Sequence, residues 1–167
     1  MLMKKLRAAL ALSLLFAAAL GLVTPAYATL QYTATHRSNA MTDLVTALGS
    51  TGYLMILTGS PPASVATVDS GTELVDLPLS STAGTVSAGV LTFNSITATA
   101  AVATGTAAHF LLCSTSSVAN CVAVSSTTRV AQGSVGTSGA DLNLATTSIV
   151  SAATISITSW TITANGA

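Results

Sequence analysis

Few residues of this chain are of types that do chemistry, and we consider their spacing first. The two cysteines, Cys113 and Cys121, lie eight positions apart. With His36 and His109 they would supply four zinc ligands, but the chain has neither a C-x2-C nor an H-x3-H cluster. We therefore favour a disulfide, which would close a loop of about nine residues and contribute roughly 2 to 3 kcal/mol.

The sequence gives little support for a Ser-His-Asp catalytic triad or for a calcium or glycosidase site built from carboxylates. Neither histidine has an acidic residue near it in sequence, and the chain has no G-x-S-x-G motif. Asp69, Glu73 and Asp76 cluster in V-D-S-G-T-E-L-V-D, but their spacing does not match a D-x-D-x-D-G calcium loop, so solvated charges around a turn are expected. No pair of acids stands out for glycoside hydrolysis. We expect a protein that is not an enzyme and has no cofactor and no metal.

Sugar binding would require exposed aromatic platforms. The aromatic residues beyond position 28 are Tyr32, Tyr53, Phe93, Phe110 and Trp160, and their spacing forms no exposed stripe. Trp160 is expected in the core. A glycan partner therefore has no direct support in the sequence.

The charges divide the chain into two parts. Three of its five basic residues stand in the first seven positions, before an apolar run over 8–23 and the ending Ala26-Tyr27-Ala28. This layout is typical of a secretory signal peptide, and sixteen apolar residues are fewer than the about 20 of a spanning helix. We expect residues 1–28 to be removed, no stable membrane span afterwards, and an exported protein, extracellular or periplasmic.

Removal of residues 1–28 would leave 139 residues with two arginines, five acidic residues, no lysine and a net charge of −3. This balance argues against a nucleic-acid groove, a polybasic membrane patch and a lysine nucleophile. With so few charges, little repulsion opposes association. We expect self-association or packing into a larger protein lattice.

The same 139 residues contain 26 Thr and 20 Ser, about a third of them, and short apolar alternations. Thr and Val favour strands. We predict an all-β fold, an antiparallel sandwich or jelly-roll-like domain of about eight short strands over 53–167. An arm and one short helix over 29–52 precede it.

The helix is predicted over 39–48, with Ser38 or Asn39 as its N-cap and Gly49 as its stop. Its apolar residues follow the i, i+3, i+4, i+7 spacing: Met41, Leu44, Val45 and Leu48. The strands are predicted over 53–58, 73–80, 84–94, 96–104, 109–114, 120–125, 130–135 and 154–163.

Four of these strands carry further expectations. Strands 109–114 and 120–125 would form a hairpin that holds the two cysteines. Pro78 suggests that strand 73–80 lies at an edge or ends there. The apolar residues of strand 154–163 change parity, which predicts a bulge near Ser159 or a strand that buries both faces in turn.

The first strand indicates a candidate interface. Leu54 and Ile56 would face the core, which leaves Tyr53, Met55 and Leu57 on a face too apolar for open solvent. Either the helix or another subunit should cover that face. The candidate interface residues are Tyr53, Met55, Leu57, Trp160 and Ile162.

The order of five segments resembles a known group of proteins. These are R-S-N-A-M-T-D-L-V-T-A-L-G, Y-L-M-I-L-T-G-S-P-P, A-G-V-L-T-F-N-S-I-T, V-G-T-S-G-A-D-L-N-L and T-I-S-I-T-S-W-T-I-T. Together they are similar to small virion-associated proteins of tailed bacteriophages, described as head-decoration or tail proteins. The resemblance implies a β-rich structural protein of a virion.

Two function classes stay open at this point. The first is a structural subunit of a virion or extracellular assembly. The second is a secreted binding module, an adhesin or carbohydrate-binding sandwich that uses loops such as 114–120 and 136–141.

Overall fold

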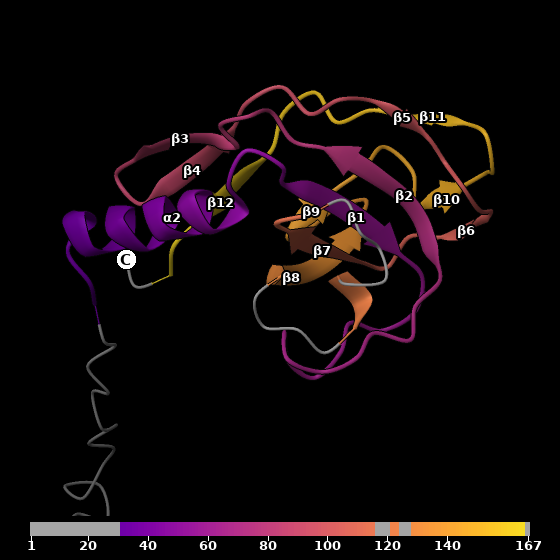
Figure 1. The fold of residues 1–167 in the computed structure, drawn as a ribbon, viewed down its shortest axis with the longest axis horizontal. Helices are drawn as coiled ribbons and strands as arrows, with labels where there is room; N and C mark the ends of the chain where they lie inside the picture. Colours follow the sequence, from indigo (N-terminus) through magenta and orange to yellow (C-terminus); the bar gives the residue numbers. More distant parts are fainter. Residues whose placement is uncertain (1–30, 116–120, 124–127, 166–167) are drawn as a thin grey trace, which may run out of the picture. The chain divides into compact units, whose positions relative to one another are not determined.

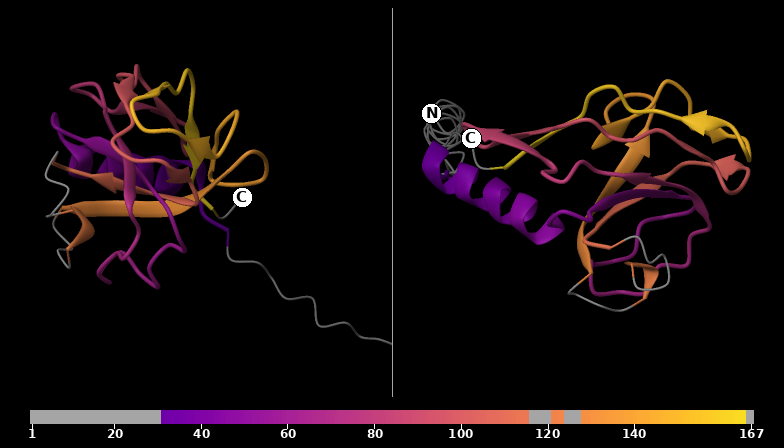
Figure 2. Two further views of the ribbon diagram at one scale, coloured as in Figure 1. Left: turned by 90° about the vertical axis from the view of Figure 1, so that its right-hand side faces the viewer. Right: turned by 45° about the horizontal axis from the view of Figure 1, so that its top comes forward.

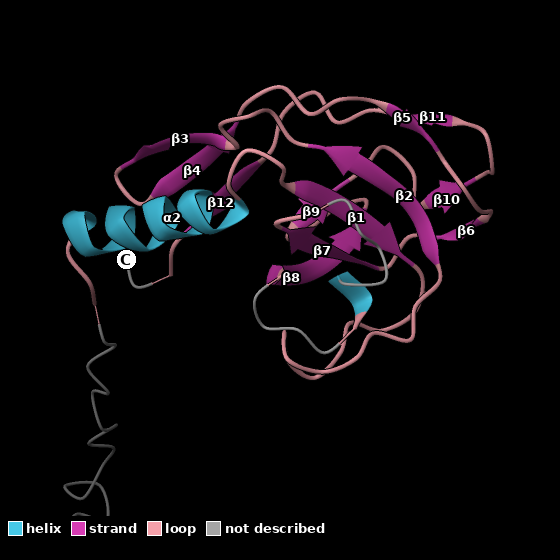
Figure 3. Cartoon of the chain, in the orientation of Figure 1, coloured by secondary structure: helices cyan, strands magenta, loops and turns pink. Residues whose placement is uncertain are grey.

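The computed structural model describes residues 31–115, 121–123 and 128–165, so the expected signal peptide lies outside the described residues. The fold is mostly β with a helix at the start of the described chain, as predicted (Figures 1 and 3), and Cys121 and Val122 add a short stretch of helical backbone. In the described part of the chain, no helix is both long and apolar enough to cross a bilayer.

The helix α2 spans Ala34–Leu48, five residues longer at its start than predicted. Its N-cap is Thr33, whose hydroxyl accepts a hydrogen bond from the His36 backbone N–H at 3.3 Å, so the expected cap at Ser38 or Asn39 is wrong. The prediction failed because residues 34–38 add no large apolar side chain to the helical pattern, Ala34 being their one apolar residue. The stop at Gly49 is confirmed, since its φ of 63° favours glycine.

The larger sheet has the strand order β2-β1-β7-β8-β9. Its strands are β1 (Tyr53–Leu57), β2 (Glu73–Pro78), β7 (His109–Cys113), β8 (Arg129–Gly136) and β9 (Leu142–Asn143). All neighbours are antiparallel except β8 and β9, which are parallel. Strand β2 lies at the edge and ends at Pro78, as the proline predicted.

A three-stranded sheet of order β12-β4-β3 packs against α2 (Figure 1). Its strands are β3 (Gly84–Ser87), β4 (Val90–Phe93) and β12 (Thr161–Thr163). The β3–β4 turn is tight, with φ of 51° at Ala88 and 83° at Gly89, and the Gly89 N–H donates to Ser38 Oγ of α2 at 3.0 Å. This bond ties the helix to the hairpin.

Two short ribbons complete the fold, β10-β6 and β11-β5. They consist of β5 (Thr99–Ala100), β6 (Gly105–Thr106), β10 (Ser148–Ile149) and β11 (Thr154–Ile155). Figure 2 shows them at the opposite end of the described domain from α2.

Four strand predictions are corrected. The predicted strand 84–94 is a hairpin of two strands, β3 and β4, and within 96–104 the strand β5 covers only Thr99–Ala100. Strand β7 pairs with β8, and Cys121 and Val122 have helical backbone, so the predicted hairpin between 109–114 and 120–125 does not form. The predicted strand 154–163 is two strands, β11 and β12, which belong to different sheets. Its change of parity marks this transfer between sheets, so neither the bulge nor the doubly buried strand is correct.

The core is sandwich-like and has two parts. The main cluster lies between the sheets and under α2, and includes Leu54, Ile56, Phe110, Leu112 and Trp160. A smaller cluster lies on the other face of the larger sheet and contains Met55, Leu57, Leu111, Cys113 and Cys121. Both faces of the larger sheet are therefore buried by the chain itself.

Candidate functional site

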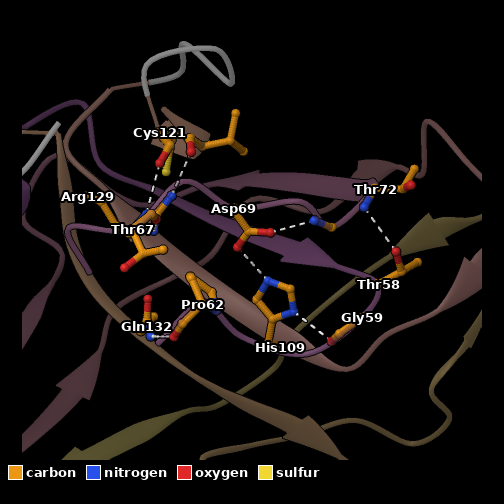
Figure 4. Close-up of polar contacts among 12 residues, drawn as sticks. Thr58, Gly59, Pro62, Thr67, Asp69, Thr72, His109, Cys121, Arg129 and Gln132 are labelled. Carbon is orange, nitrogen blue, oxygen red and sulfur yellow. Dashed lines mark hydrogen bonds and ion pairs between the residues drawn. The ribbon is translucent and has the colours of Figure 1, made fainter. Parts of the chain in front are cut away.

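Two of the polar residues considered in the sequence analysis, Asp69 and His109, meet on the second face of the larger sheet. The long connection between β1 and β2, residues 58–72, lies over this face (Figure 4). A loop of this length without regular structure needs specific contacts to hold it in place. Four side chains supply them: Asp69, His109, Arg129 and Gln132.

His109 and Asp69 form a buried pair. The His109 Nε2 and Asp69 Oδ2 atoms lie 2.7 Å apart, and both side chains are fully buried. The His109 Nδ1–H donates to the Gly59 carbonyl at 3.0 Å, and Asp69 Oδ1 accepts from the Gly71 N–H at 2.6 Å. The pair therefore joins both ends of the 58–72 loop to β7.

Arg129 fixes the middle of the loop. Its guanidinium donates to the carbonyls of Thr67 at 2.7 Å, Cys121 at 2.9 Å and Val122 at 3.0 Å, and the residue is 1% exposed. Burial lowers the pKa of Arg129, and the negative charge of Asp69 opposes that shift. All three partners are backbone carbonyls, so the guanidinium holds both the 58–72 loop and the Cys121 segment in place through charge-assisted hydrogen bonds.

The last contact comes from Gln132, whose Nε2 donates to the Pro62 carbonyl at 2.7 Å. Its Oε1 is buried and has no hydrogen-bond partner among the described residues. The disulfide between Cys113 and Cys121 is confirmed, with the Cα atoms 5.9 Å apart. It closes the same face, because Cys121 belongs to the segment that covers it.

This arrangement explains what the cluster can do chemically. Both ring nitrogens of His109 already face oxygen acceptors, and the ring is 0% exposed, so it has no free atom to offer a substrate. The cluster therefore holds a loop. Sequence analysis missed it because Asp69 lies 40 residues before His109, and only folding brings the two together.

One sequence expectation about these residues is corrected. Asp69 is 7% exposed, so it is not a solvated turn residue, whereas Glu73 and Asp76 are half-buried on β2. The zinc set is separated, because both cysteines are in the disulfide and His36 is exposed on α2. The described residues contain no group of three or more His, Cys, Asp or Glu placed to hold a metal.

Three residues of the candidate interface are also buried. Met55 and Leu57 are 0% exposed under the 58–72 loop and the Cys121 segment, and Trp160 is 6% exposed in the main core, as expected for Trp160 itself. They cannot contact another molecule in this fold. Tyr53 and Ile162 are partly exposed. The expectation that the helix or another subunit covers the Met55 face is wrong, because the chain's own loop does so.

A surface feature remains that sequence analysis did not find. Four hollows follow the C-terminal segment from β11 to Asn165, and we call them together the C-terminal furrow. Neighbouring hollows share lining residues: Asn143 and Ser159, Asp141 and Thr161, then Met41 and Asn165. The third is the largest of the four, at about 580 Å³.

The lining of the furrow is nearly neutral. Arg37 and Asp141 are its charged residues, and Asp141 is engaged with Ser134, whose backbone N–H and hydroxyl both donate to Asp141 Oδ2 at 2.8 and 2.7 Å. These hydrogen bonds lower the pKa of Asp141. The remaining lining consists of apolar, hydroxyl-bearing and amide side chains together with His36. Such a surface suits an uncharged partner.

No protein-family model, curated protein or solved structure matches this chain.

Proposed function

We propose that this protein is a non-enzymatic structural subunit of a virion or of an extracellular assembly, and that it acts through protein–protein contacts. The observation that carries the proposal is the C-terminal furrow, a long, nearly neutral hollow beside the outer edge of strand β12. Strand edges and apolar hollows are surfaces to which other chains bind.

Three further features support this proposal. The chain has few charges to oppose close packing. The polar cluster around His109 is used to hold a loop. The segments from 37–49 to 154–163 resemble virion-associated phage proteins, while the N-terminal charge pattern and the disulfide are typical of export. We therefore place the protein outside the cytoplasm or on a virion.

Light scattering and electron microscopy of the purified protein test the proposal. We expect oligomers that grow with protein concentration, and ordered particles or filaments on grids. A monodisperse monomer over the whole concentration range would overturn it.

One observation favours a second candidate, a secreted binding module for glycans. The first hollow, of about 400 Å³, is rimmed by hydroxyls, among them Thr146, Ser148, Thr154, Ser156 and Thr158. Hydroxyl-rich rims suit polyhydroxyl ligands, although no aromatic platform lines this hollow. Binding on a glycan array by a monomer, lost in the Thr154→Val/Ser156→Ala variant, would support this candidate over the first.

A further inference from the structure

The buried His109–Asp69 pair needs a proton to keep its geometry. Gly59 offers His109 a backbone carbonyl, which can only accept a hydrogen bond, so Nδ1 carries a hydrogen (Figure 4). The Nε2 and Asp69 Oδ2 atoms lie 2.7 Å apart, a distance that requires a proton between them. Whichever of these two atoms carries it, the pair binds one proton more than a neutral histidine and an ionised aspartate do.

The pair has no alternative partner that would make this proton unnecessary. Both side chains are fully buried, and the other carboxylate oxygen of Asp69 already accepts from the Gly71 N–H. Without the proton, the Nε2 lone pair of His109 would face a buried carboxylate with no donor between them. Buried acceptors left in this state are costly, so the contact would open.

The charges around the pair favour the proton. Among the described residues, the neighbouring segments bring four charged side chains near it: Glu73 and Asp76 on β2, Arg129 on β8, and Asp141 before β9. Asp141 bonds Ser134, the residue of β8 that pairs with His109. The guanidinium opposes an added proton and the three carboxylates favour it. The acidic groups outnumber the basic one.

The pair also holds both ends of the 58–72 loop. His109 bonds the carbonyl of Gly59 at one end, and its partner Asp69 bonds the N–H of Gly71 at the other. The middle of the loop has separate contacts. Leu57 is paired with His109 across β1 and β7 and is 0% exposed. Opening of the pair would therefore release the loop ends beside Leu57.

We propose that the His109–Asp69 pair is a proton-dependent latch. While the pair holds its shared proton, the ends of the 58–72 loop stay closed over Leu57. When the proton passes to solvent at alkaline pH, the two side chains separate and the loop ends open. This inference goes beyond the proposed function and does not depend on it.

The direction of the pH effect follows from the number of bound protons. Above about pH 6.5, a histidine in an open or unfolded chain is neutral and an aspartate is ionised. The closed pair holds one proton more, so opening releases one. The equilibrium constants for opening and for unfolding should therefore rise about tenfold per pH unit above that value. The stabilisation is complete at lower pH and is lost as the pH rises.

The composition of the chain makes this effect measurable. Beyond residue 28, the side chains of types that titrate between about pH 6.5 and 9 are His36 and His109, because no lysine is present there and both cysteines form the disulfide. His36 is exposed on α2. A His36→Ala background therefore leaves His109 as the one histidine.

Asp69→Asn is the matched variant in that background. Its amide N–H can donate to Nε2 from the position of Oδ2, and its oxygen can still accept from Gly71, so the contact forms without a shared proton. Urea denaturation from about pH 6 to 9 compares the two chains. We expect the unfolding constant to rise about tenfold per pH unit in the aspartate chain and to stay level in the asparagine chain. Equal slopes would overturn the latch.

Hydrogen exchange tests the loop itself. The Asp69 N–H bonds the Val122 carbonyl at 3.0 Å and is protected while the loop is closed. After correction for the intrinsic exchange rate, its protection should fall about tenfold per pH unit in the aspartate chain. Protection that does not change with pH would overturn the latch. If the asparagine chain does not fold, the aspartate chain decides alone, because a level unfolding constant above about pH 6.5 would also overturn it.

Discussion

At the scale of single residues, the buried His109–Asp69 pair shows how a catalytic residue type can serve the fold. A histidine and a carboxylate at 2.7 Å are also found in hydrolase triads, but here the second ring nitrogen bonds a backbone carbonyl. Hydrogen bonds to this pair replace the bonds to water that the loop residues would otherwise make. The stabilising effect of the pair therefore requires both partners.

Removal of one partner should be costly. Asp69→Ala leaves the buried His109 ring and the Gly71 N–H without their acceptor, and we expect a loss of about 3 to 5 kcal/mol in the free energy of unfolding. Urea denaturation measures it. Asp43→Ala, which removes an exposed carboxylate on α2, is the control and should change stability by less than about 0.5 kcal/mol. Equal effects of the two substitutions would contradict the role given to the pair.

Glu73 gives a prediction with a defined pH dependence. Burial, with a smaller effect from the charge of Asp76, raises the pKa of Glu73 above its ordinary 4.5. The folded state therefore binds this proton more tightly than the unfolded state, and ionised Glu73 destabilises the fold above the folded pKa. Glu73→Gln should raise the thermal midpoint at pH 7 and leave it unchanged below pH 4.5. A stabilisation that persists at the lower pH would contradict this reason.

At the scale of elements, the start of α2 shows that a residue of a type favoured at N-caps need not be the residue that caps the helix. Ser38 and Asn39 are good cap residues by type, yet the helix begins at Ala34 and Thr33 caps it. Ser38 instead bonds Gly89 of the β3–β4 turn, so its side chain serves a tertiary contact.

The cap can be tested by paired substitutions. Thr33→Ala should lower the free energy of unfolding by about 1 kcal/mol, because the His36 N–H loses its acceptor. Asn39→Ala, at an exposed position inside the helix, should be neutral or slightly stabilising. Chemical denaturation followed by circular dichroism compares the two. A larger loss of stability for Asn39→Ala than for Thr33→Ala would place the cap where the sequence pattern predicted it.

At the scale of the whole molecule, one aromatic cluster joins the two main sheets. Trp160, next to β12, stacks on Phe93 of β4 at 4.3 Å between ring centroids and meets the edge of Phe110 of β7 at 5.0 Å. Its indole N–H donates to the Asp141 carbonyl at 2.9 Å, just before β9. Three parts of the fold therefore depend on one side chain.

Trp160→Ala should cost about 3 to 5 kcal/mol, through lost burial and a cavity between the sheets. Because the tryptophan links both sheets, we expect the whole domain to become less stable while it keeps one cooperative transition. Calorimetry can measure this change. Two separate transitions, with one at the wild-type temperature, would show that the sheets are not coupled through this residue.

The sequence by itself determined the fold class, the end of α2 at Gly49, most strand positions and the Cys113–Cys121 pairing. These properties depend on composition, local periodicity and turn residues, which act over a few positions. It also placed Leu54 and Ile56 correctly in the core, since alternation along a strand is local.

Tertiary structure decided which segments pack against one another. The meeting of Asp69 with His109, the cover over Met55 and Leu57, and the division of 154–163 between two sheets all join positions far apart in the chain. An apolar strand face shows that something must cover it, but it does not show which segment. Here a loop held by buried polar side chains covers it, and the C-terminal furrow formed where the last strands pass beside β8, β9 and α2.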